Sequence, residues 1–421
     1  MFLAALAQSR TRRPNIIWMM ADDMGYGDLG CYGQRHIKTP NMDRLAAEGL
    51  RFTSAYAGSS VCAPCRSTLM TGQHSGHTRV RWNHSVKTKQ RVPLLPSDVT
   101  VASVLKKAGY ATGITGKWGL GEPDTTGIPT LQGFDEWYGF LNQDHALEYY
   151  PDHLWRGPKK EAVPKGAYVT DLFTQEALAF VRKHRSAPFF FYFTPTTPHA
   201  PHDAPDLGEY NDKPWKPEHK AYAAMVASFD RAVGAILTLL KDLNLESETI
   251  VFCTSDNGAG NRPGLPFFNG TGPFRAAKGD VYEGGHRVPM IVRWPGRVKP
   301  GSTSDYPWVF YDFLPTAAEL AGAQAPRGID GISIAPVLLG KTPNKREYFY
   351  WEGHTRGFHQ AIRIDNWKGV RHGLKGRVEL YDLRSDISES RDVAAAHPEI
   401  VARVTNLLES ARSDNEDYPA A

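Results

Sequence analysis

The chain has 421 residues, of which 41% are hydrophobic and 22% are charged, and this balance is typical of a globular protein. The length predicts one large domain with a smaller domain appended to it. The formal net charge of +4 is small for this size, so we expect neither nucleic-acid binding nor electrostatic attraction to a membrane surface. The four cysteines are too few for a disulfide scaffold in a chain of this length.

The first residues of the chain are apolar and lead to Ala5-Leu6-Ala7, which is similar to the end of a secretory signal peptide. No basic segment precedes them. We therefore expect residues 1–12 to be either a signal-peptide remnant, which would make the protein periplasmic or secreted, or a disordered start, which would leave it cytoplasmic. No run approaches the roughly 18 apolar residues of a membrane span, so none is predicted.

From residue 13 to about residue 340, segments typical of strands alternate with segments typical of helices. Strands are predicted over residues 15–20, 110–115, 189–194, 249–254 and 289–294. Helices are predicted over residues 41–50, 98–108, 221–241 and 312–321. This alternation favours an α/β fold with a large mixed, mainly parallel central sheet flanked by helices.

After residue 340 the pattern changes to short strand-like runs separated by turns. They are followed by a helix predicted over residues 398–411, with Pro398 in its first turn. This pattern predicts a smaller antiparallel sheet packed with a terminal helix. We therefore expect a catalytic domain over residues 13–340 and a C-terminal subdomain over residues 341–421.

Acidic and amide side chains follow two of the predicted strands. Asp22 and Asp23 come directly after the first strand, and Asp256 and Asn257 follow the fourth in the same way. Because the carboxyl ends of parallel strands share one edge of a sheet, these side chains are expected to converge. Three carboxylates and an amide form an all-oxygen site, which suits a hard cation such as Ca²⁺ or Mg²⁺.

A cysteine motif precedes another predicted helix. It reads Cys62-Ala63-Pro64-Cys65-Arg66, a C-x-P-x-R pattern that also contains C-x-x-C. A zinc site is disfavoured because no second C-x-x-C and no nearby histidine pair would complete it. A redox role is disfavoured because no thioredoxin-like βαβ pattern surrounds the motif.

The C-x-P-x-R motif does not stand alone. The other segments, in a fixed order around it, are Asp22-Asp23, Gly116-Lys117-Trp118, Pro198-His199, Asp256-Asn257 and Lys278. Together they closely resemble the active site of the type I sulfatases, which belong to the alkaline phosphatase superfamily. The resemblance extends from about residue 15 to the C-terminal tail.

This resemblance implies a formylglycine at position 62, made from the cysteine by a formylglycine-generating enzyme. It implies that the catalytic residues are Cys62, Arg66, Lys117, His199 and Lys278. It implies that the ligands of one Ca²⁺, or Mg²⁺, are Asp22, Asp23, Cys62, Asp256 and Asn257. In that family the arginine orients the nucleophile, the two lysines hold the sulfate group, and the histidine serves the leaving oxygen.

One position departs from the family pattern. Sulfatases often carry a histidine directly after Gly-Lys-Trp, where it acts as a base when the sulfated intermediate collapses, but this chain has Gly119. Another residue must then act as this base, or the collapse of the sulfated intermediate is less well catalysed. The histidines in segments that could supply it are His74, His77, His84 and His145, and the sequence does not choose among them.

We therefore predict hydrolysis of a sulfate monoester. Residues 133–138, 142–150 and 153–156 are rich in aromatic and polar side chains, a mixture that often binds sugars, so the expected substrate is a sulfated carbohydrate, such as a sulfated galactose or N-acetylgalactosamine. One alternative is a phosphoester or phosphonate hydrolase of the same superfamily. Another, motivated by Gly119, is a non-catalytic binder of sulfated glycans.

Overall fold

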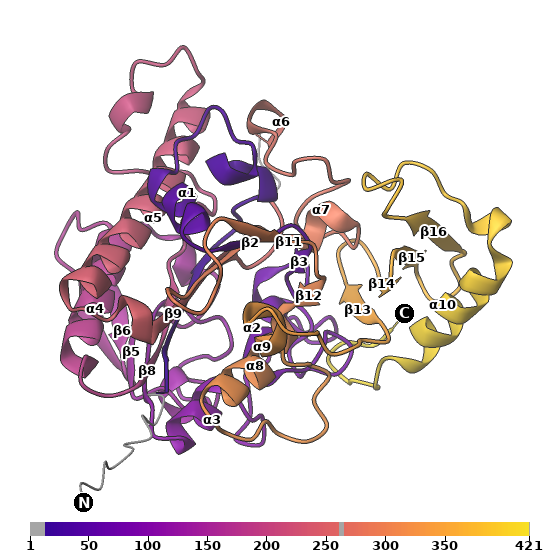
Figure 1. Ribbon diagram of the computed structural model, residues 1–421, viewed down its shortest axis with the longest axis horizontal. Helices are drawn as coiled ribbons and strands as arrows, with labels where there is room; N and C mark the ends of the chain where they lie inside the picture. Colours follow the sequence, from indigo (N-terminus) through magenta and orange to yellow (C-terminus); the bar gives the residue numbers. More distant parts are fainter. Residues whose placement is uncertain (1–12, 261–264, 421) are drawn as a thin grey trace, which may run out of the picture.

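The computed structural model describes residues 13–260 and 265–420, so the expectation for residues 1–12 lies outside the described residues. Its centre is a ten-stranded sheet with helices on both faces (Figure 1). In spatial order the strands are β11 (Ser302–Ser304), β2 (Leu50–Phe52), β10 (Met290–Arg293), β9 (Thr249–Ser255), β1 (Asn15–Ala21), β8 (Phe189–Thr194), β4 (Ala111–Lys117), β5 (Glu136–Phe140), β6 (His153–Arg156) and β7 (Lys159–Ala162).

The middle of this sheet is parallel. Strands β9, β1, β8, β4 and β5 run in one direction, and antiparallel pairs involve β10 on one side and the β6–β7 hairpin on the other. The predicted mixed, mainly parallel sheet is confirmed. A two-stranded parallel sheet of β3 (Ala55–Tyr56) and β12 (Trp308–Val309) lies beside it.

Strand β1 shows how the sheet is covered. All seven of its residues are buried. Ile16 and Trp18 belong to one hydrophobic cluster, whereas Ile17 and Met19 belong to another. Because successive side chains of a strand point to opposite faces, each face of the sheet has its own core. This explains the continuous apolar run in the sequence, which is typical of buried parallel strands.

Helices supply the two covering layers (Figure 1). One layer holds α1 (Pro40–Ala47), α4 (Val169–His184) and α5 (Pro217–Asp242), and the other holds α2 (Cys62–Thr71), α3 (Val101–Lys107) and α8 (Phe313–Leu320). Short helices are α6 (Leu265–Phe268), α7 (Glu283–His286) and α9 (Ala335–Leu338). Helix α4 and the β6–β7 hairpin are absent from the sequence-based prediction. Helix α3 begins later than predicted because Thr100 caps it, accepting a hydrogen bond from Ser103 N.

Helix α5 is long and apolar. In the described part of the chain it is the one helix long and apolar enough to cross a membrane, but 78% of its most apolar window is buried inside the fold. Phe229, for example, stacks on Phe193 of strand β8. The composition of α5 is thus explained by its packing against the sheet.

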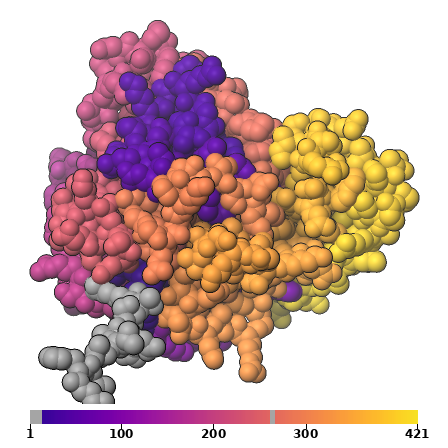
Figure 2. Space-filling view, viewed as in Figure 1, coloured from indigo at the N-terminus to yellow at the C-terminus, as the bar shows by residue number. Residues whose placement is uncertain are grey.

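The C-terminal residues form a lobe at one side of the molecule (Figure 2). Its antiparallel sheet has the order β13 (Phe349–Gly353), β14 (His359–Ile364), β15 (Trp367–His372) and β16 (Val378–Asp382), and α10 (Pro398–Ser410) packs on it. The predicted sheet and terminal helix are therefore confirmed. The opposite face of the sheet shares a hydrophobic cluster with the larger part of the chain, in which Trp351 lies beside Tyr56. The boundary at residue 340 remains a prediction.

Candidate active site

The acidic residues predicted to converge do so at the ends of β1 and β9. These strands are paired in parallel with Ala21 opposite Ser255, so the residues that follow them are brought together. Asp23 N donates to Asp256 Oδ1 over 3.2 Å, and Asn257 Nδ2 donates to Asp23 Oδ1 over 2.8 Å. All four side chains, Asp22 included, are buried.

This group of oxygens fits a hard cation. Three carboxylates converge, and Oδ1 of Asn257 is buried with no hydrogen-bond partner among the described residues. An unpaired buried carbonyl oxygen is costly unless it binds something, and oxygen ligands of this kind are those that Ca²⁺ and Mg²⁺ prefer. The sequence-based prediction of an all-oxygen site is therefore consistent with the chemistry of these side chains.

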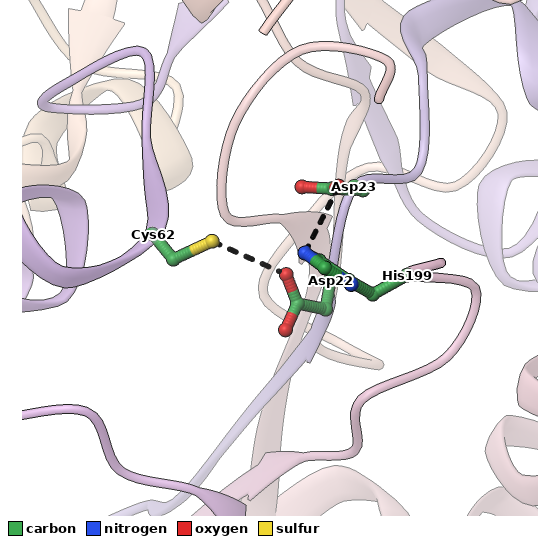
Figure 3. A group of neighbouring side chains, drawn as sticks. All are labelled: Asp22, Asp23, Cys62 and His199. Carbon is green, nitrogen blue, oxygen red and sulfur yellow. Dashed lines mark hydrogen bonds and ion pairs between the residues drawn. The ribbon is translucent and has the colours of Figure 1, made fainter. Parts of the chain in front are cut away.

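Helix α2 carries Cys62 to the same place. The helix begins at Cys62, all of its residues are buried, and Asn83 Oδ1 accepts a hydrogen bond from Ala63 N at its first turn. Cys62 Sγ lies 3.5 Å from Asp22 Oδ1 (Figure 3). Burial, followed by the charges of Asp22 and Asp256, raises the pKa of the Cys62 thiol to about 12. The unmodified thiol is therefore protonated near neutral pH and is a poor nucleophile.

Arg66 lies one turn further along α2 and ties the helix to the sheet. Its guanidinium group donates to Asp256 Oδ2 over 2.8 Å and to Thr194 Oγ1 and Lys117 O over 2.6 Å each. The side chain is fully buried. Because a buried charge must be paired, the Asp256 carboxylate and the Arg66 guanidinium depend on each other.

Two ammonium groups, one buried on Lys117 and one partly exposed on Lys278, face the first pair of carboxylates. Lys117 Nζ, at the end of β4, lies 2.6 Å from Asp22 Oδ2, and Lys278 Nζ lies 2.7 Å from Asp23 Oδ1. Burial alone would raise the pKa of Asp22, but Lys117 and the other nearby cations outweigh it and hold the pKa well below its usual value. Asp22 is therefore ionised. The ammonium groups of Lys117 and Lys278 each face one of the two carboxylates, Asp22 and Asp23.

His199 completes the group from the loop after β8. Its Nε2 faces Asp23 (Figure 3) and lies 3.5 Å from Asp23 Oδ2. The same atom lies 3.1 Å from Lys278 Nζ, and the His199 side chain is 19% exposed. The loop is held by Tyr149, whose hydroxyl donates to the carbonyl oxygens of Thr196 and His199. His199 and Lys278 are thus partly exposed at the edge of a cluster whose other members are buried.

The aromatic stretch expected to bind sugars is mostly part of the core. Phe134, Trp137, Tyr138 and Tyr149 are all at least 94% buried, with exposures of 1%, 3%, 6% and 4%. Rings this deeply buried cannot stack on a sugar, so this use of the sequence pattern is not supported for them. Their packing explains the aromatic density of the stretch.

The histidines considered as substitute bases occupy different places. The chain after α2 turns back along it, since Thr78 Oγ1 bonds to Ser67 Oγ over 2.6 Å and Asn83 reaches Ala63. His74 and His77 consequently lie at the far end of this helix, roughly 15 Å along its axis from Cys62. His84, which follows Asn83, arrives at the end where Cys62 lies. His145 stacks on His153, with ring centroids 4.5 Å apart.

The cluster of His74, His77 and Asp330 connects the end of α2 to the loop around residue 330. His77 Nδ1 lies 3.0 Å from Asp330 Oδ1, and His74 Nε2 lies 3.7 Å from the same oxygen. His74 Nδ1 accepts a hydrogen bond from Gly76 N over 3.1 Å, so the proton of the neutral ring is on Nε2, which leaves that atom unable to bind a metal. These histidines fasten the end of α2 to the loop around residue 330.

Sequence reasoning missed two contributors to this site. Thr194, which binds Arg66, ends a predicted strand, so the same strand-end argument that found Asp22 could have found it. Asn83, which caps α2, gives no local signal, because its role depends on the chain folding back along the helix.

Comparison with known proteins identifies the family and the fold. The sulfatase family model matches residues 14–323, and the model for the C-terminal region of N-sulphoglucosamine sulphohydrolase matches residues 276–414. N-acetylgalactosamine-6-sulfatase of Canis lupus familiaris is 35% identical over 84% of this chain and 71% of its own length. Arylsulfatase A of Homo sapiens is 34% identical over 94% of this chain and 87% of its own length.

A solved structure gives the same result. The structure of Ps i-CgsB in complex with k-i-k-neocarrahexaose has a TM-score of 0.86 and 30% identity, covering 97% of this chain and 95% of that chain. The extent of the family match and the identity to these relatives show that the chain belongs to the sulfatase family and is a sulfuric ester hydrolase.

Proposed function

We propose that this sulfatase hydrolyses a sulfate monoester on a sulfated carbohydrate, with a formylglycine made from Cys62 and one bound Ca²⁺, for which Mg²⁺ is the alternative. The observation that carries the proposal is the position of Cys62, whose Sγ lies 3.5 Å from Asp22 at the centre of the buried charged cluster. The carbohydrate is supported by the names of the relatives, one an N-acetylgalactosamine-6-sulfatase and one solved with a neocarrahexaose.

Modification of Cys62 agrees with its surroundings. The raised pKa of its thiol makes the unmodified residue a poor nucleophile in this site. Formylglycine would supply a hydrated aldehyde, of which one hydroxyl attacks sulfur and the other allows sulfate to leave as the aldehyde forms again. Arg66 would orient that group by charge-assisted hydrogen bonds. The partner required for maturation is a formylglycine-generating enzyme.

The charged residues would act on the sulfate group. Asp22, Asp23, Asp256 and Asn257 would hold the cation, which would supply positive charge opposite the sulfate oxygens. Lys117 and Lys278 would bind these oxygens from either side, because both ammonium groups already project into the cluster. His199, which is partly exposed at the edge of the cluster, would give a proton to the leaving sugar oxygen.

The test is turnover by protein matured with the formylglycine-generating enzyme. We expect release of sulfate from a regiochemically defined panel of sulfated sugars and from an aryl sulfate, with far slower hydrolysis of an aryl phosphate. Mass spectrometry should show formylglycine at position 62, and Cys62→Ala should abolish turnover. Cys65→Ser is the matched control, because this cysteine is buried in the same helix but packs in the hydrophobic core. Full activity of Cys62→Ala would refute the proposal.

Location remains a prediction. The sequence pattern of the first residues favours a periplasmic or secreted enzyme over a cytoplasmic one. Cell fractionation of the source organism, with N-terminal sequencing of the mature protein, would decide between the two.

A further inference from the structure

We propose that Gln143 is a substrate-contacting residue of this site, whose side-chain amide occupies the place of the side chain that Gly119 lacks and donates a hydrogen bond to an oxygen of the bound sulfate ester. This inference rests on the proposed function and extends it. It assigns a role to a residue in the loop after β5.

Gly119 and Gln143 compete for one space. A Cβ atom placed on Gly119 would lie 2.4 Å from Gln143 Nε2 and 3.6 Å from Arg66 Cδ. The first distance is too short for two heavy atoms that are not bonded, so a side chain at position 119 would have to push the amide of Gln143 out of its present place. The φ angle of Gly119 is +78°, which also favours glycine there. The space in question borders the side chain of Arg66.

The residues on both sides of Gln143 are held by polar contacts. Gly119 N donates to Leu141 O over 2.9 Å, which holds the two loops together. On one side of Gln143, Asn142 Nδ2 donates to Glu122 Oε2 over 2.9 Å. On the other side, Asp144 pairs with Arg91, which also pairs with Glu122. These contacts order the loop around Gln143, whose amide itself contacts Gly119 O.

The side-chain amide of Gln143 can form further hydrogen bonds. Gln143 Nε2 makes only a long contact of 3.4 Å with Gly119 O. Gln143 Oε1 and Arg66 Nε are both buried and have no hydrogen-bond partner among the described residues. Buried polar groups are normally paired, so the unpaired N–H donor of Arg66, whose Cδ borders the space at Gly119, indicates a place where an oxygen acceptor of a ligand could bind.

The chemistry of the place favours an anionic acceptor. Arg66 carries positive charge, and its guanidinium donates to the backbone oxygen of Lys117, whose own ammonium group projects into the charged cluster. A sulfate ester offers oxygen acceptors only, which match the N–H groups of the amide. Because an amide does not titrate in the working range, Gln143 adds a donor without adding a base.

The first experiment removes the donor in the full-length matured enzyme. Gln143→Leu should lower kcat/KM on an aryl sulfate by about 10- to 100-fold, the loss expected of one donor to a developing charge. Gln143→Glu should be worse at neutral pH, because its carboxylate repels sulfate, and should recover as the pH falls and the carboxyl group becomes a donor. Gln132→Leu is the control, since the side-chain amide of Gln132 donates to the backbone oxygens of Leu95 and Thr126. It should change thermal stability and leave kcat/KM within about twofold.

The second experiment tests the shared space by a double-mutant cycle with Gly119→His. The single variant should be nearly inactive, because the new side chain collides with Gln143. Adding Gln143→Ala should restore at least tenfold of the lost activity and introduce a histidine ionisation into the pH profile of kcat/KM. The strain of the +78° backbone is the same in both backgrounds and cancels in the comparison.

Each outcome decides between the hypotheses. If the wild-type enzyme releases no sulfate, the proposed function fails. If the wild-type enzyme is active but folded Gln143→Leu and Gln143→Glu both keep wild-type kcat/KM and pH profile, the inference about Gln143 is overturned. If the effects of Gly119→His and Gln143→Ala are additive, the conclusion that the two side chains compete for one space is wrong.

Discussion

Lys117 and Asp22 form an ion pair of 2.6 Å at the ends of two strands that are not adjacent in the sheet, with β8 between them. Both side chains are almost fully buried. Burying two charges costs desolvation energy, which further charged partners must offset. Here Arg66 lies 3.7 Å from the same carboxylate oxygen of Asp22. The ion pair therefore links the stability of the fold to the proposed function, in which the same ammonium group binds sulfate.

Removing this ammonium group should cost both activity and stability. Lys117→Ala leaves the buried Asp22 with a weaker partner, so we expect a loss of about 3 kcal/mol in the free energy of unfolding, measured with denaturant. Turnover should fall by more than about 100-fold, because a group facing the developing charge is lost. Lys106→Ala is the control, since Lys106 forms an exposed pair with Asp135 and should cost less than about 1 kcal/mol. Equal costs for both variants would contradict the argument from burial.

The cation should be removable and should stabilise the fold. Chelation should abolish activity, and Ca²⁺ or Mg²⁺ should restore it. Because the cation binds only the folded state, the melting temperature should rise with its concentration. Asn257→Ala should shift this dependence to higher Ca²⁺ concentrations, since it removes the unpaired Oδ1. Gln360→Ala is the control, because this amide is buried in the C-terminal sheet. Zinc found in the native site would contradict the oxygen-ligand argument.

The sequence predicted those parts of the site that depend on regular geometry. Asp22 and Asp256 could be placed together from the residues alone, because strands of a parallel sheet end at one edge. The likeness to sulfatases brought in Cys62 and Lys278, whose segments carry no strand-end signal of their own. The structure then showed all of them within one cluster.

What the sequence did not predict depends on contacts between distant segments. The place of Gln143 over Gly119 follows from the way two loops pair, and no local pattern encodes that. The aromatic stretch was assigned to sugar binding because composition alone does not distinguish a buried ring such as Trp137 from an exposed one. Helix α4 is absent from the prediction although its buried residues Phe173, Ala177 and Phe180 have helical spacing.

Acid should destabilise the fold through buried histidines. Burial, with smaller effects from its neighbours, lowers the pKa of His74 to about 4, below the 6.5 of the unfolded chain. Between these values the unfolded state binds a proton that the folded state does not, so stability falls as the pH drops below 6.5. At pH 5 this one residue should cost about 2 kcal/mol relative to pH 8, measured by denaturant unfolding.

The substitution that checks this is His74→Asn, which keeps an acceptor for Gly76 N–H. It should flatten the dependence of stability on pH between 8 and 5, even if it lowers stability overall. His36→Asn, at an exposed histidine, should leave the slope unchanged. An unchanged slope in His74→Asn would mean that other groups cause the acid sensitivity.

The base for sulfate release should be sought at His84. It follows Asn83, which caps α2 one residue from Cys62, whereas His77 is bound to Asp330 at the other end of that helix. If His84 takes the proton, His84→Asn should give a burst of leaving group followed by slow turnover, because attack proceeds and release stalls. The measurement is rapid-quench kinetics with an aryl sulfate, and the ionisation attributed to this base should disappear from the pH profile.

His77→Asn is the matched control. It should reduce thermal stability by weakening the contact between residue 77 and Asp330. The burst and turnover phases should keep their wild-type ratio. Should substitution of His84, and then of His74, His77 and His145 in turn, leave turnover intact, the idea of a substitute histidine is wrong. In that case solvent or His199 must accept the proton, and Gly119 marks a site that works without a dedicated second base.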